Sequence, residues 1–160
     1  MSIGYMVQYC VISLSIDKLP GNRYLNGIIF GFGEVTAMFF SQYLMGRMMD
    51  MSAFYVCYTL GVTSYLLLIF FPETILITYF ANVMLMTGIG GWFNTMLLIL
   101  ELRVPPQNVG SVSALTRTLA VTAASMAPTI SNLAAPIPYI CLICLATFGF
   151  LLTFFLPAPG

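Results

Sequence analysis

Two long stretches of this sequence carry no charge, and they restrict what the chain can fold into more than any other feature. Residues 52–71 and 75–100 are apolar and uncharged. A bilayer core of about 30 Å is crossed by about 20 residues of helix, so each stretch is long enough to span it. A soluble fold must present much of its surface to water, yet this chain is 60% hydrophobic and only 6% charged. The sequence therefore predicts a helical integral membrane protein.

Further apolar stretches complete the predicted set of spans. They are 24–45, interrupted by Glu34, then 112–131, carrying Arg117, and 137–156. Residues 2–16 are apolar but reach only about 22 Å at helical rise, which predicts a first span that lacks a turn or two. Short links rich in proline and glycine separate the spans at 17–22, 46–50, 71–73, 101–110 and 134–138. We expect a single all-α domain of six transmembrane helices over 1–160, with both ends on one side.

Composition and motifs argue against several other functions. The net charge is zero and histidine is absent, which leaves no clustered basic face for nucleic acid and removes the commonest metal ligand. The sequence has no paired carboxylates, no glycine-rich phosphate loop and no nucleophile beside a base. We therefore expect no enzyme activity, no cofactor, no metal site and no nucleic-acid partner.

The cysteines all fall in apolar runs, where we interpret them as small hydrophobic side chains rather than a redox pair: Cys10, Cys57, Cys141 and Cys144.

Glu34 and Arg117 are the ionisable residues that lie inside predicted spans. Glu34 has about ten residues of its span on either side, and a charge at that depth costs several kcal/mol. It is expected to face a cavity or a partner, and the alternative is a neutral acid hydrogen-bonded between packed helices. Arg117 lies about 8 Å inside its span, where its long stem can instead extend to the headgroups. Polar neighbours at Ser113, Thr116 and Thr118 favour the first interpretation, in which Arg117 lies on a helix face that contacts water.

Glycine and proline residues inside the predicted spans indicate where helices pack closely and where one bends. The spacing of Gly27 and Gly31 predicts that another helix packs closely against them, and the group Gly88, Gly90 and Gly91 predicts the same in the span 75–100. Pro128 falls inside the span 112–131 and should kink it, which makes it a candidate gating residue. Trp92 is either a packing residue or part of an aromatic wall of a binding site.

Residues 9–37 carry a resemblance to a known family. The pattern runs from Tyr9 through Ser13-Leu14, then Leu19-x-Gly21-Asn22-x-Tyr24-Leu25-Asn26, then Gly31-x-x-Glu34-Val35-x-Ala37. It resembles helices seven and eight of the organic cation/anion transporter family, which belongs to the major facilitator superfamily. Later segments resemble the same family: Gly46-Arg47, Glu101-Leu102 with Pro105, Ser113 to Arg117, and Ala127-Pro128.

The resemblance implies a fold and a set of site residues. It implies that the full protein has twelve helices, of which this chain carries seven to twelve as one six-helix half. It also implies that Glu34 and Arg117 face a central cavity, where Tyr9 would add aromatic surface for substrate. Trp92 is a further aromatic candidate for this cavity, and the resemblance does not extend to it. Gly46, Arg47 and Glu101 fall in the loops that latch the family's transport states. The sequence departs from the family pattern at Thr36 and Met48, which replace a proline and an arginine, and near Gln107 and Asn108, where an arginine is usual.

The function we expect is transport of small organic ions across a membrane by alternating access. The expected partners are an organic ion, the lipid bilayer and a second six-helix half, and the plasma membrane is favoured over an organelle membrane. A non-transporting structural subunit of a larger membrane assembly, derived from a transporter, is the alternative. A homodimer of halves and an incomplete gene model are further alternatives, and the short first span favours incompleteness.

Overall fold

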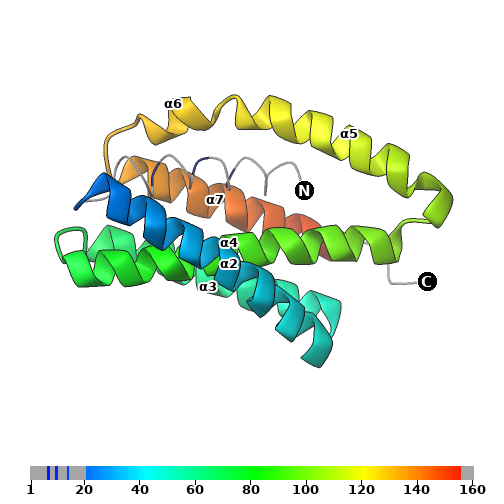
Figure 1. The fold of residues 1–160 in the computed structure, drawn as a ribbon. Helices are drawn as coiled ribbons and strands as arrows, with labels where there is room; N and C mark the ends of the chain where they lie inside the picture. The colour runs from blue at the N-terminus through cyan, green and yellow to red at the C-terminus, as the bar shows by residue number, and fades with distance from the viewer. Residues whose placement is uncertain (1–6, 8–9, 11–13, 15–20, 156–160) are drawn as a thin grey trace.

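A computed structural model of the chain describes Val7, Cys10, Leu14 and residues 21–155 (Figure 1). Every regular element in this described part is helical. The elements are α2 (Arg23–Arg47), α3 (Asp50–Phe70), α4 (Ile75–Arg103), α5 (Pro106–Ala124), α6 (Ala127–Ser131), α7 (Ile137–Leu152) and the 3₁₀ turn η2 (Thr153–Phe155). The predicted first span, 2–16, lies outside the described residues except for three positions.

Four helices in the described part are long and apolar enough to cross a membrane. They cover Arg23–Arg47, Met51–Phe70, Ile75–Arg103 and Ile137–Phe155. These correspond to four of the five full spans predicted above. Their ends lie close to the predicted links at 46–50 and 71–73, because the turn-forming residues there act locally on the backbone.

The remaining predicted span, 112–131, is not one continuous helix. The backbone forms α5 up to Ala124, turns at residues 125–126 and restarts as α6, with Pro128 in the first turn of α6. A proline inside a helix removes one backbone donor and clashes with the carbonyl four residues earlier, which here belongs to Ala124. The predicted loop 101–110 is also wrong, because α4 continues to Arg103 and α5 begins at Pro106. Proline is well suited to a helix start, where its missing N–H would be unpaired anyway.

The helix α4 is the centre of the described bundle. It packs against α3 on one side and α2 on the other, while α7 packs against α3. In its most apolar stretch 61% of α4 is buried, compared with 28% for α2 and 22% for α7. The segment formed by α5 and α6 arches past the other helices and makes less contact with them (Figure 1).

Glycines set the close approach of α3 and α4. A Cβ added to Gly88 would meet the backbone of Gly61, and a Cβ at Gly91 would lie 2.8 Å from Cys57 Sγ. Residues later in α4 therefore face residues earlier in α3, which makes the two helices antiparallel. The predicted packing role of Gly88 and Gly91 is confirmed.

The α2 and α4 helices run in parallel with a constant register of 53 residues. A Cβ at Gly33 would lie 2.7 Å from Met86 Cβ, and a Cβ at Gly90 would lie 2.9 Å from Ala37 Cβ. One turn further on, Asn94 Nδ2 donates to Ser41 Oγ at 3.4 Å. Gly90 thus packs as predicted, but against α2 rather than α3.

Candidate functional site

Three residues of the motif at 21–26 have structural roles at the start of α2. Gly21 has φ +107°, a conformation that L side chains rarely adopt, and a Cβ there would meet the hydroxyl of Tyr79. Asn22 caps the helix by accepting a hydrogen bond from Tyr24 N at 2.9 Å. Asn26, one turn later, is fully buried. The motif therefore starts the helix and seats one of its polar side chains in the bundle.

Glu34 lies near the middle of α2 with an exposed side chain. It is 11 residues from Arg23 and 13 from Arg47, or about 16 Å and 20 Å at helical rise. Gly27 and Gly31 precede it by seven and three residues, so the three share one flank of the helix. A Cβ at either glycine would find nothing within 4 Å. The prediction that Gly27 and Gly31 pack against another helix is therefore wrong for the described part of this chain, because Gly33 supplies the contact to α4.

Arg117 lies on α5, and its side chain is also exposed. It stands 11 residues after Pro106, about 16 Å along the helix. Its neighbours Thr116 and Thr118 satisfy their hydroxyls within the helix, by donating to Val112 O at 2.7 Å and Ala114 O at 3.0 Å. The structure shows no hydrogen bond or ion pair between Arg117 and Glu34. The two residues belong to helices that the structure does not pack closely, so their sharing of one cavity stays a prediction.

Trp92 is a packing residue in the described structure. Its side chain is 1% exposed, and its ring centroid lies 5.7 Å from that of Phe54 and 6.3 Å from that of Tyr58. This placement favours the packing interpretation made from the sequence over an aromatic wall of a cavity. Tyr9, the other aromatic candidate, lies outside the described residues.

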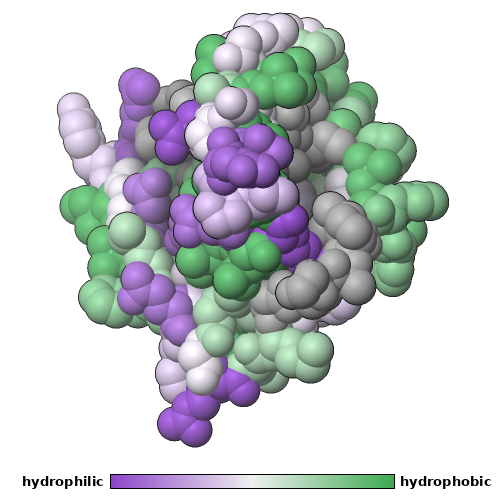
Figure 2. Space-filling view, turned by 90° about the vertical axis from the view of Figure 1, so that its right-hand side faces the viewer, coloured by the Kyte–Doolittle hydropathy of each residue, from purple (hydrophilic) through white to green (hydrophobic). Residues whose placement is uncertain are grey.

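The candidate gating residues divide between the two ends of the bundle. Gly46 and Arg47 close α2, and Glu101 lies in the last turn of α4, at the same end of the molecule (Figure 1). The Arg47 guanidinium carbon lies 5.6 Å from the ring centroid of Tyr43, which is a cation–π contact. Figure 2 looks at this end and shows hydrophilic residues gathered there, with hydrophobic residues on the flanks. Pro128, exposed at the start of α6, belongs to the helix break described above.

A group of buried polar side chains between α2 and α4 was not predicted from the sequence. Thr78 and Asn82 face the core one helical turn apart, with 1% and 0% exposure, and Asn26 is 0% exposed on α2. Among the residues that the structure describes, neither amide atom of Asn82 has a hydrogen-bond partner, and Thr78 Oγ1 has none either. The 53-residue register places Asn26 opposite Tyr79, at the level of Thr78 and Asn82. The i, i+4 spacing of Thr78 and Asn82 inside an apolar span was the available signal.

Known proteins provide no independent assignment of this arrangement. Comparison of the chain with protein-family models, with curated proteins and with solved structures finds no match.

Proposed function

We propose that this chain is the carboxy-terminal six-helix half of a transporter that moves small organic ions by alternating access. The observation that carries the proposal is the position of Glu34. Its side chain is exposed at the middle of an apolar helix, where contact with lipid would cost several kcal/mol. An exposed flank that contains such a residue and two uncovered glycines is suited to a water-filled cavity at the interface with a second half.

Arg117 gives the proposed cavity a charge of the opposite sign. It lies on α5, which makes little contact with the rest of the described bundle, and its side chain is exposed. A carboxylate on one wall and a guanidinium on another would act on organic cations and organic anions respectively. The proposal includes six membrane-spanning helices, of which two are the first span and the broken α5–α6 segment.

Substitution of the two charged residues tests the proposal. In vesicles that contain the chain together with its complementary six-helix half, Glu34→Gln is expected to change uptake of organic cations more than of anions. Arg117→Ala is expected to change uptake of organic anions more than of cations. Thr153→Ala, on the turn after α7 and away from the proposed cavity, is the control. Unaltered affinity and rate for every tested ion in both charge variants would contradict the proposal.

The alternative is a structural subunit of a larger membrane assembly, and the open face at Gly27 and Gly31 supports it as well. Small residues allow a helix of a partner subunit to approach closely. The two functions differ in what happens at Glu34. A structural subunit should retain assembly and tolerate Glu34→Gln, because the neutral amide can still form a hydrogen bond between packed helices.

A further inference from the structure

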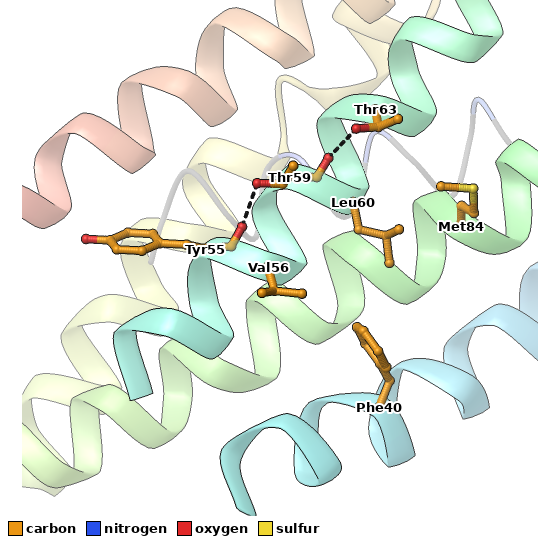
Figure 3. A pocket seen from close by; sticks show the side chains of 7 residues that line it. All are labelled: Phe40, Tyr55, Val56, Thr59, Leu60, Thr63 and Met84. Carbon is orange, nitrogen blue, oxygen red and sulfur yellow. Dashed lines mark hydrogen bonds between the residues drawn. The ribbon is translucent and has the colours of Figure 1, made fainter. Parts of the chain in front are cut away.

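A pocket opens between α2 and α3 and has α4 as its floor (Figure 3). It has a volume of about 430 Å³, which is within the range of small-molecule pockets, about 300–1,000 Å³. Phe40 of α2 points across it toward Val56 and Leu60 of α3 (Figure 3). The complete lining is Phe40, Tyr55, Val56, Thr59, Leu60, Thr63 and Met84. The residues come from three helices, so no local motif marks the pocket in the sequence.

The side-chain hydroxyls of the lining either form hydrogen bonds within α3 or point away from the pocket. Thr59 Oγ1 donates to Tyr55 O at 2.9 Å, and Thr63 Oγ1 donates to Thr59 O at 2.8 Å (Figure 3). The Tyr55 hydroxyl points away from Leu60 and Met84 in the same view. None of the seven lining residues carries a charge. The pocket therefore offers apolar contact and no free donor for recognition of a polar ligand.

The pocket opens on a different flank of α2 from Glu34. Phe40 follows Glu34 by six residues, which at 3.6 residues per turn places it about 120° around the helix axis. The flank beside Phe40 carries Phe32, Phe39 and Tyr43, which are 64%, 71% and 60% exposed. The pocket is thus continuous with an apolar surface that is suited to lipid, and it is separate from the proposed substrate cavity.

The depth of the pocket selects the part of a lipid that fits it. Thr59 and Leu60 lie at the middle of α3, about 15 Å from either end of that helix at helical rise. A bilayer core is about 30 Å thick, so this position is near its midplane and far from the headgroups. We propose that the pocket binds a hydrocarbon chain of a bilayer lipid. The inference rests on the membrane location in the proposed function and is independent of transport.

Photolabelling from within the bilayer tests this inference. The full chain is placed in vesicles of phosphatidylcholine that carries a diazirine near the middle of one acyl chain, and labelled residues are identified by mass spectrometry after irradiation. Met84, half-buried in the pocket, is expected to take more label than Phe80, which is 61% exposed one turn earlier on α4. A chain resident in the pocket stays beside Met84, whereas Phe80 meets passing lipid.

Variants that fill the pocket provide the decisive comparison. Thr59→Phe is expected to reduce the Met84 label severalfold, and Thr63→Phe, one turn further on, is a second filling variant. Thr122→Phe is the matched control, because Thr122 is also an exposed helical threonine whose hydroxyl donates to the carbonyl four residues earlier. This control should leave the Met84 label unchanged.

The outcomes distinguish failure of the proposed lipid site from failure of the proposed membrane location. Labelling of Phe80 with little label on Met84 would overturn the lipid site, and it is the result expected if a protein helix occupies the pocket instead. A Met84 label that persists in both filling variants would also overturn it. Absence of label from both residues would contradict the membrane location itself.

Discussion

At Gly88 the backbones of α3 and α4 come so close that a single added carbon has no space. A Cβ there would clash with the backbone nitrogen of Gly61, and it would lie 2.8 Å from Gly61 Cα and 3.0 Å from Cys57 O. Backbone atoms cannot rotate out of the way as a side chain can. The position is therefore a strict test of the described packing between these two helices.

Gly88→Ala should destabilise the folded chain by about 1–3 kcal/mol, since overpacking forces backbone shifts. The measurement is the free energy of unfolding in detergent by titration with a denaturant. Gly31→Ala is the matched control, because a Cβ at Gly31 meets nothing within 4 Å. Gly31→Ala should stabilise the folded chain by about 0.5–1 kcal/mol, because alanine has less backbone entropy to lose on folding than glycine. Equal effects of the two substitutions would contradict the packing of α3 against α4.

The amide of Asn82 is buried and has no hydrogen-bond partner within the described part of the chain. Asn82→Leu replaces it by an apolar side chain of similar size, so the unpaired donor and acceptor are removed. The expected result is a gain in the free energy of unfolding of about 1–3 kcal/mol. Asn94→Leu is the comparison, because Asn94 donates to Ser41 Oγ, and a loss is expected there. A loss of stability in Asn82→Leu would mean that the amide has a hydrogen-bond partner in the bilayer.

Among the elements, the segment α5–α6 differs most from the other helices. It contains many hydroxyl and amide side chains together with Arg117, and it is absent from the helices found long and apolar enough to cross a membrane. Its break at residues 125–126 follows from the proline two residues later. A broken helix near a polar residue is a common arrangement in transporters, where the freed backbone lines a cavity.

Removal of the proline should join the two parts of this segment. In Pro128→Ala the new N–H can donate to Ala124 O, so residues 125–126 are expected to enter a continuous helix. Hydrogen–deuterium exchange of the peptide around these residues should become slower than in the wild type. Pro106→Ala is the control, because the first helical residue has no intrahelical acceptor for its N–H. Unchanged exchange in Pro128→Ala would show that tertiary contacts, not Pro128, break the helix.

At the scale of the whole molecule, α4 lies between α2 and α3, and the flank of α2 that carries Glu34 is left uncovered by the described residues. The proposed cavity needs a second wall that these helices do not supply. Alternating access also needs a second body against which the first can rock. Both requirements concern the assembly rather than any single helix.

The chain reconstituted alone is therefore expected to show no saturable uptake of organic ions. The measurement is uptake of a panel of radiolabelled organic cations and anions into vesicles, with the number of chains per particle determined in parallel. Co-reconstitution with the complementary half should restore uptake. Saturable uptake by the monomeric chain would contradict the two-half mechanism, whereas uptake by a dimer would favour two copies as the two halves.

The sequence by itself determined the helical class, the approximate ends of four spans and the break near Pro128. These follow from local physics, namely the length of apolar runs and the backbone restrictions of proline and glycine. Only the tertiary structure decided that Gly33, Gly88, Gly90 and Gly91 carry the packing while Gly27 and Gly31 stay open. It also assembled the pocket beside Phe40 from three helices. The reason is that a membrane helix is apolar on every side, so its sequence has no amphipathic stripe to mark the face that meets another helix.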